Sequence, residues 1–256
     1  MTAEGAARGA QRVGFVIGGA QKAGTTALAW MIVDHPKLMI AMGKEAHWFD
    51  DERNFRRGAG PDSTYEERYF AGAEEGATLF DATPSYLWWP RAPERIRAYN
   101  PAMRWVVLLR DPVERAYSHW NMARSRGTED LGFVGAVAAE AERMRTADPD
   151  RAQRISYFSR GLYAHQVRRL WSLFPRDQTL IPRSERLDAD PAGVVGEVLE
   201  FVGVEPLAEV EPQRRNVGSY AAPIDPEERR VVRAMYEKDI RDLERLLGWD
   251  LSDWLR

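Results

Sequence analysis

The sequence contains no cysteine and only four histidines in 256 residues. Without cysteine the chain has no disulfide, no thiolate metal ligand and no thiol nucleophile. The histidines are too scattered along the sequence to indicate a metal cluster. No apolar run approaches membrane-spanning length, and the polar start of the chain lacks the hydrophobic core of a signal peptide. We therefore expect a cytoplasmic protein with no membrane span and no required metal.

A large excess of charge of either sign is also absent. The chain carries 36 Lys and Arg against 39 Asp and Glu, for a net charge of −3. Proteins that bind nucleic acid usually carry a basic surplus, so the composition gives no indication of a nucleic-acid partner. The length suits one large domain. We predict a disordered N-terminus over residues 1–12 and a single domain over residues 13–256, and the sequence gives no indication of oligomeric state.

The stretch from Val13 to Trp30 organises the rest of the chain. It opens on a short apolar run that is typical of a buried parallel strand. A glycine-rich turn with Gly19 and Gly24 follows, and an apolar run after it has the composition of a helix start. Glycines let backbone N–H groups close on a phosphate, and a helix N-terminus adds partial positive charge. We predict a phosphate-binding turn, with an ordinary glycine turn as the alternative.

The turn differs from a Walker A loop in one respect. Gly19 and Gly24 have the G-x-x-x-x-G spacing, but Thr25 stands where the loop requires lysine, and the lysine is Lys22, inside the turn. A Walker lysine reaches the β- and γ-phosphates, and the hydroxyl beside it holds Mg²⁺. We therefore predict a P-loop-like turn that is not built for a Mg–triphosphate. The alternatives are a Mg-dependent P-loop kinase with a permuted loop and a nucleotide-binding module without catalysis.

Two candidate general bases lie close together in the segment from Gly43 to Phe49. Glu45 and His47 are both able to accept a proton, and Trp48 lies beside them. A lone glutamate or histidine near aromatic residues is more often structural than catalytic, so both readings stay open here.

A second polar segment follows a predicted strand at residues 78–80. Asp81 to Tyr86 contains a proline turn, and polar residues just past a strand lie where ligands bind in parallel sheets. Trp88 and Trp89 come next. The rings of Tyr86, Trp88 and Trp89 either join the core or, with Trp48, form the wall of a substrate cleft.

The clearest buried strand is predicted from Arg104 to Leu109, and Arg110 follows it at the carboxyl edge of the sheet. A helix over residues 113–124 then contains Ser118. If this strand neighbours the first one, Arg110 lies next to the glycine turn. A strand that ends in Asp111 also resembles a Walker B element, but a preceding cation opposes Mg²⁺ and suits a bound phosphate.

Further helices alternate with short strands along the rest of the chain. Caps of Asp and Pro at the start and Gly at the end bound several of them. The pattern predicts an α/β fold in which a central parallel sheet is flanked by helices. Late in the chain, Arg215, Gly218 and Tyr220 belong either to a loop that closes over an anionic ligand or to a surface turn. The predicted helices cover residues 64–70, 93–99, 133–146, 164–174, 191–201 and 226–247.

Taken together, these motifs resemble the sulfotransferases that use 3′-phosphoadenosine 5′-phosphosulfate (PAPS). FVIGGAQKAGTTAL resembles their 5′-phosphosulfate loop, and KEAHWF resembles the KE-x-H-F-F segment of the glycan O-sulfotransferase branch. DATPSYL is similar to that branch's EKTPSYF, and LLRDPVERAYSHW to its R-D-P-x-x-R-A-x-S element, which binds the nucleotide 3′-phosphate. SRGLYAHQVRRLWSLFP, RRNVGSY and LLGWDLSDWL look like bacterial members of the family. The matches cover nearly the whole chain in the family's order.

The resemblance implies PAPS as the sulfuryl donor and 3′,5′-ADP (PAP) as the product, with no metal. It implies Glu45 as the general base, and His47 is the second choice because cytosolic sulfotransferases of small molecules use a histidine. Desolvation beside Trp48 is expected to raise the pKa of Glu45. The residues implied in donor binding are Lys22, Ala23, Gly24, Thr25 and Thr26 for the 5′-phosphosulfate, Arg110 and Ser118 for the 3′-phosphate, and Arg215, Gly218 and Tyr220 for the covering loop.

One departure from the family's pattern bears on the acceptor. Ala82 stands where the family's EKTPSYF has a lysine, which leaves Lys22 and Lys44 as the nearest cations by sequence. This departure and the lack of a basic surplus argue against a long polyanionic glycan. We expect the acceptor hydroxyl to belong to a small molecule, a natural product or a sugar.

Overall fold

The computed structural model describes residues 11–55, 64–212 and 222–256. The expected disorder of residues 1–10 and the expected roles of Arg215, Gly218 and Tyr220 lie outside the described residues. At the start of the described chain, Gln11 contacts the carbonyl of Ala77, and Arg12 contacts that of Tyr99. These two residues therefore contact the domain.

The core of the fold is a parallel sheet of five strands in the order β2-β3-β1-β4-β5. The central strand β1 pairs with β3 on one side and with β4 on the other, so Phe15 lies opposite both Phe80 and Arg104. This confirms the predicted central parallel sheet. The strands are β1 (Phe15–Gly19), β2 (Leu38–Ile40), β3 (Thr78–Asp81), β4 (Arg104–Val107) and β5 (Thr179–Leu180).

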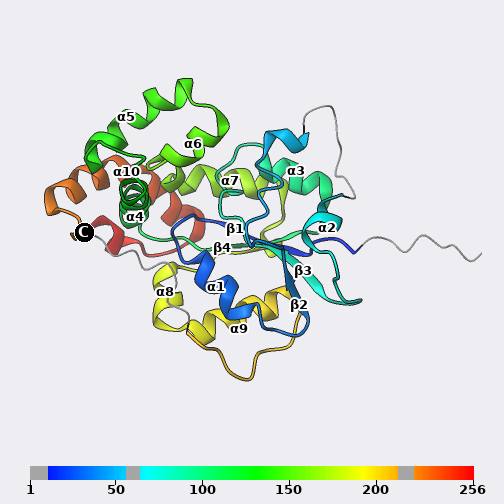
Figure 1. Cartoon of the computed structure of the whole chain (residues 1–256). Helices are drawn as coiled ribbons and strands as arrows, with labels where there is room; N and C mark the ends of the chain where they lie inside the picture. Colours follow the sequence, from blue (N-terminus) through cyan, green and yellow to red (C-terminus); the bar gives the residue numbers. More distant parts are fainter. Residues whose placement is uncertain (1–10, 56–63, 213–221) are drawn as a thin grey trace, which may run out of the picture.

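Helices cover both faces of the sheet (Figure 1). One face carries α1 (Thr25–Ile32), α8 (Ser184–Ala189) and α9 (Pro191–Val202). The other face carries α3 (Ala92–Tyr99), α4 (Pro112–Ser125), α7 (Tyr163–Leu173) and α10 (Pro226–Leu247). The remaining helices are α2 (Thr64–Tyr69), α5 (Phe133–Thr146) and α6 (Pro149–Ile155), with short 3₁₀ turns at Glu52–Phe55, Ser159–Gly161, Arg176–Gln178 and Ser252–Leu255.

Three short elements were not predicted from the sequence: β2, α6 and α8. Each is too short to show an apolar period, because β2 has three residues, α6 seven and α8 six. The strand predicted from Arg104 to Leu109 is also shorter than expected, since β4 ends at Val107. Beyond it, Leu109 forms a single parallel bridge with Arg183.

Close packing at the end of β1 requires glycine. The indole of Trp105 on β4 lies so near Gly18 that a Cβ added at Gly18 would sit 2.5 Å from the ring. All five residues of β1 are buried, and Trp105 has no exposed surface. The glycine therefore allows the largest side chain of the neighbouring strand to pack flat against β1 immediately before the turn.

Aspartate caps begin four of the described helices, and the sequence predicts two of them, at Asp190 and Asp225. Asp111, Asp148, Asp190 and Asp225 each accept from the backbone of the first turn of α4, α6, α9 and α10, and a proline follows each of them. Gly203 and Gly248 end α9 and α10 in the left-handed conformation, with φ of 80° and 70°.

We expect the Asp225 cap to be measurable. Its carboxylate accepts from the backbone N–H of Glu227 at 2.9 Å and of Glu228 at 3.2 Å. Replacing Asp225 with Ala should lower the free energy of unfolding by about 1 kcal/mol, because these N–H groups lose their partner. Asp225→Ser, which keeps an acceptor, should retain most of the stability in urea unfolding. Equal stability of the Ala and Ser variants would contradict the assignment.

Candidate active site

The turn between β1 and α1 is open to an anion. Gly24 occupies the N-cap position of α1 with φ 93°, and no side chain caps the helix. The first N–H groups of α1 are therefore left for a ligand, and the helix N-terminus favours negative charge. A side chain at Gly24 would be strained at this φ, and its Cβ would lie 3.2 Å from Leu187. This backbone fits the 5′-phosphosulfate group that the resemblance implies.

Positive charge converges on the same turn. The ammonium of Lys22 lies 4.0 Å from Met122 Sδ, at the face of α4. Burial lowers the pKa of Lys22, and the nearby guanidinium groups of Arg110 and Arg126 lower it further. The three positive charges repel one another, and a bound anion would offset this repulsion. The arrangement again suits a phosphate or sulfate group.

Arg110 lies at the same edge of the sheet as Lys22. Its guanidinium donates to the backbone carbonyl of Lys22 at 3.2 Å and approaches the carboxylate of Glu114 at 3.4 Å. Its own carbonyl accepts from the hydroxyl of Tyr163 at 3.0 Å. Ser118 is buried in α4, the helix that begins just after Arg110. The structure therefore places Arg110 in contact with Lys22, and it places Ser118 on the helix that follows Arg110.

Asp111 has a structural role in α4. Its carboxylate accepts from Val113 N at 2.7 Å and from Glu114 N at 3.2 Å, and it lies 3.5 Å from Arg229 of α10. Burial raises the pKa of Asp111 to about 6, although these N–H bonds oppose the shift. A carboxylate that caps a helix in this way is not presented as a Walker B metal ligand.

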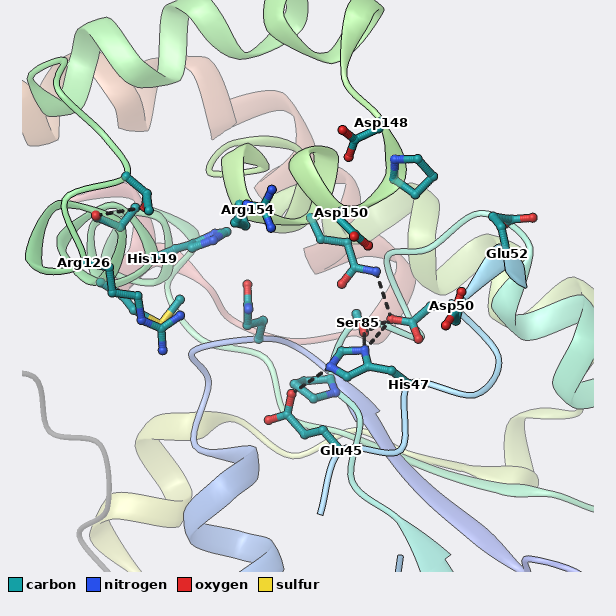
Figure 2. A pocket seen from close by; sticks show the side chains of 18 of the residues that line it. Glu45, His47, Asp50, Glu52, Ser85, His119, Arg126, Asp148, Asp150 and Arg154 are labelled. Atoms are coloured by element: carbon teal, nitrogen blue, oxygen red, sulfur yellow. Dashed lines mark hydrogen bonds and ion pairs between the residues drawn. The ribbon is translucent and has the colours of Figure 1, made fainter. Parts of the chain in front are cut away.

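Glu45 and His47 belong to one chain of contacts (Figure 2). Glu45 Oε1 lies 2.8 Å from the ammonium of Lys44, and its Oε2 lies 3.3 Å from His47 Nε2. The other ring nitrogen of His47, Nδ1, lies 2.9 Å from Asp50 Oδ2. The two candidate bases are therefore coupled, with cationic and anionic groups alternating from Lys44 to Asp50.

This coupling corrects the expected pKa of Glu45. Burial pushes that pKa upward as expected, but hydrogen bonds from His47 and Lys44 outweigh it and lower the pKa to about 2. Burial likewise pushes the pKa of His47 downward, yet its bonds to Asp50 and Glu45 raise it to about 10. At neutral pH Glu45 is ionised and His47 is protonated.

Backbone strain is concentrated at these residues. Among the non-glycine residues that the structure describes, positive φ occurs at Lys22 (71°), Lys44 (70°) and His47 (49°). Each such conformation costs roughly 1–3 kcal/mol, and such strain clusters at functional sites. All three residues belong to the two segments that the sequence singles out.

The segment after β3 supports the backbone of the segment from Gly43 to Phe49, which contains Glu45. Asp81 is fully buried and accepts from the hydroxyls of Tyr65 at 2.8 Å, Tyr86 at 2.6 Å and Thr83 at 2.7 Å. It also lies 3.4 Å from the backbone N–H of Ala46. Asp81 thus fixes the backbone beside Glu45 and does not itself face a ligand.

A cavity of about 570 Å³ opens in front of Glu45 and His47. This size is typical of ligand pockets. Gln21 of the glycine turn and Met122 of α4 line the cavity. Asp150 and Arg154 of α6 lie across it from Glu45 (Figure 2). The polar and charged lining residues are Gln21, Glu45, His47, Asp50, Asp51, Glu52, Arg53, Ser85, His119, Arg126, Thr128, Asp148, Asp150, Gln153 and Arg154.

The aromatic residues predicted for a cleft wall do not line this cavity. Trp48, Tyr86 and Trp89 are buried, with 6%, 0% and 8% of their surfaces exposed. Trp48 stacks on Tyr65 with ring centroids 5.3 Å apart. Trp88 is partly buried, and its indole N–H donates to Ser159 Oγ at 3.1 Å. The structure assigns these rings to the core, and charged side chains take their place in the cavity wall.

Several residues of the site were missed by the sequence analysis. The sequence does hold a signal for Asp50, because Asp50 follows His47 by three residues and side chains at this separation can touch in a tight turn. Gln153 and Arg154 come from α6, far away in the sequence, and no local signal connects them with the segment from Gly43 to Phe49. His119 lies next to Ser118 on α4, but its ring is buried and its pKa is lowered well below the usual value, first by burial.

The sequence matches the sulfotransferase domain family over residues 14–217. Because this match covers most of its length, the chain belongs to the sulfotransferase family. Human heparan sulfate glucosamine 3-O-sulfotransferase 6 is 34% identical over 190 residues, which are 74% of this chain and 52% of that protein. Human bifunctional heparan sulfate N-deacetylase/N-sulfotransferase 3 is 30% identical over 203 residues, 75% of this chain and 22% of that protein. The chain spans about half the length, or less, of these curated relatives.

One solved structure agrees with this family, and a second shows the same fold. A sulfotransferase from Alicyclobacillus acidocaldarius superposes with a TM-score of 0.81 at 31% identity, covering 96% of this chain and 99% of the other. The sulfotransferase domain from the Synechococcus PCC 7002 olefin synthase, at 17% identity and a TM-score of 0.54, shares the fold. Within the described ranges, every helix is too short or too polar to cross a bilayer. The side chains in those ranges form no cluster of three or more potential metal ligands.

We expect the imidazole of His47 to stay protonated far above neutral pH. Its pKa is raised from 6.5 to about 10, so its protonation stabilises the fold fully below about pH 6.5 and loses that effect as the pH rises toward 10. NMR titration of the ring signals tests this, and His47→Gln identifies the His47 signal among four histidines. A His47 midpoint below pH 7 would contradict the contact geometry.

Proposed function

We propose that the protein moves a sulfuryl group from PAPS to a hydroxyl of a small-molecule, natural-product or sugar acceptor and releases PAP. Membership of the sulfotransferase family supports PAPS as the donor. The observation that carries the proposal is the convergence of Lys22, Arg110 and Glu45. Arg110 contacts the backbone of Lys22 just before the uncapped N-terminus of α1, and the charge of Glu45 acts on the ammonium of Lys22. Glu45 and Gln21, the neighbour of Lys22, line one cavity.

The donor side consists of the glycine turn and the start of α4. Lys22 and the backbone N–H groups of residues 23–26 hold the 5′-phosphosulfate, and Arg110 with Ser118 holds the 3′-phosphate. PAPS, when bound, supplies the sulfuryl group and a phosphate leaving group. The ammonium of Lys22 provides positive charge where the leaving oxygen gains negative charge. The covering loop with Arg215, Gly218 and Tyr220 is proposed from the family resemblance.

On the acceptor side, Glu45 is the proton acceptor. The protonation states favour it over His47, because at neutral pH Glu45 is ionised while His47 already holds its proton. A carboxylate with a pKa of about 2 is a weak base, so its basicity must rise before transfer. An acceptor hydroxyl that displaces Lys44 from Glu45 removes one of the bonds that lower this pKa.

The charge of the cavity bears on the kind of acceptor. Six carboxylates line it, from Glu45, Asp50, Asp51, Glu52, Asp148 and Asp150, against three arginines and the protonated His47. A long polyanionic chain would meet repulsion from this wall. We therefore do not propose heparan sulfate, which the names of the curated relatives contain, as the acceptor of this protein. An uncharged acceptor with a hydroxyl fits the lining better.

Removing Lys22 tests the donor side. We expect Lys22→Ala to weaken PAP binding by about 10- to 100-fold in calorimetry, because a hydrogen bond to a charged group is worth roughly 1.5–3 kcal/mol. Lys37→Ala, which removes an exposed cation beyond α1, should leave the affinity unchanged. Tight binding of Mg–ATP together with no binding of PAP would favour the P-loop kinase and end the proposal.

Removing the carboxylate of Glu45 tests the acceptor side. In assays with radiolabelled PAPS and a mixture of acceptor alcohols, Glu45→Gln should lower turnover by roughly 10²- to 10⁴-fold, the usual contribution of a general base. PAP affinity should change little. Near-normal turnover of Glu45→Gln, with an inactive His47→Ala, would move the role of base to His47. PAP binding without turnover on any acceptor would instead indicate a binding module.

A further inference from the structure

Helix α6 places the side chain of Gln153 against the segment from Glu45 to Asp50. Gln153 lines the cavity, and its amide Nε2 donates to Asp50 Oδ2 at 3.3 Å. That same oxygen receives the hydroxyl of Ser85 and lies 2.9 Å from His47 Nδ1. The side chain of Asp50 has no exposed surface, so these three groups decide where its carboxylate points.

The position of Asp50 is passed on to Glu45. His47 lies between the two carboxylates, with Nδ1 on Asp50 and Nε2 at 3.3 Å from Glu45 Oε2 (Figure 2). A rotation of the Asp50 carboxylate would turn the ring of His47 and lengthen its contact with Glu45. Gln153 is therefore connected to Glu45 through two intervening side chains.

Gln153 is itself held firmly. Its backbone carbonyl accepts from Ser156 Oγ at 3.1 Å and from the guanidinium of Arg160 at 3.3 Å. Arg160 is buried, and its guanidinium lies 4.3 Å from the ring centre of Trp88. The end of α6 is thus anchored to the core at the point where it meets Asp50.

The chemistry of an amide suits this place. An amide donates a hydrogen bond but carries no charge, so it orients Asp50 without neutralising it. A lysine or arginine there would compete with His47 for the carboxylate and weaken its hold on the ring. The charged groups that face His47 are Glu45 and Asp50, and Gln153 is the uncharged donor that packs on them from α6.

We propose that Gln153 is a positioning residue for sulfuryl transfer: it fixes Asp50, which keeps the imidazole of His47 turned toward Glu45. This inference rests on the proposed function, in which Glu45 accepts the proton. By this proposal α6, which was not predicted from the sequence, helps to orient the side chain of Glu45. Ser85 supports the same oxygen of Asp50 and belongs to the same arrangement.

The test compares Gln153→Met, which keeps the length of the side chain but cannot donate, with Arg151→Gln, an exposed neighbour on α6. Gln153→Met should lower kcat about tenfold, because the hydrogen bond to the Asp50 carboxylate is lost and His47 and Glu45 lose their orientation, with the KM for PAPS unchanged. The NMR titration midpoint of His47 should fall toward its usual value. Arg151→Gln should leave all three quantities as in the unmodified protein.

Ser85→Ala provides a second variant if Gln153→Met does not fold, and the His47 midpoint should fall in it too. Unchanged His47 midpoint and kcat in a folded Gln153→Met would overturn the proposal. A lower midpoint with unchanged kcat would also overturn it, since Asp50 would then be positioned without consequence for transfer. Failure of the proposed function is recognised separately, because the unmodified protein would then bind no PAP in calorimetry.

Discussion

The parallel pairing of β1 with β4 is the constraint on which the site depends. Because parallel strands end at the same edge of a sheet, the glycine turn after β1 and Arg110 after β4 must meet there. The guanidinium of Arg110 reaches the carbonyl of Lys22 at 3.2 Å as a result. Gly18 makes this pairing tight, since it lets Trp105 pack against β1 just before the turn.

Electrostatics divides the site into two parts. Around the glycine turn, Lys22, Arg110 and Arg126 repel one another and favour a bound anion. Around Glu45, by contrast, charges alternate and stabilise one another, which lowers the pKa of Glu45 and raises that of His47. The first part gathers positive charge that a bound anion would offset, whereas the second part is stabilised by its own ion pairs. Such a division suits the proposed transfer from an anionic donor with Glu45 as the base.

Local sequence signals predicted most of the fold and the glycine turn between β1 and α1. The apolar runs of β1 and β4, the caps at Asp225 and Gly248 and the glycine turn depend on neighbouring residues, so they are visible in the sequence. The remaining features depend on tertiary contacts. The pKa of Glu45 reflects the geometry of His47 more than burial beside Trp48, and the contact between Gln153 and Asp50 joins segments that no spacing relates.

A crystal structure of the complex with PAP tests the central claim most directly. The account predicts the 5′-phosphate at the N-terminus of α1 within hydrogen-bond distance of Lys22, and the 3′-phosphate on Arg110 and Ser118. The open side of the 5′-phosphate should face the cavity that contains Glu45. A nucleotide bound elsewhere, or one whose 5′-phosphate points away from Glu45, would contradict the account.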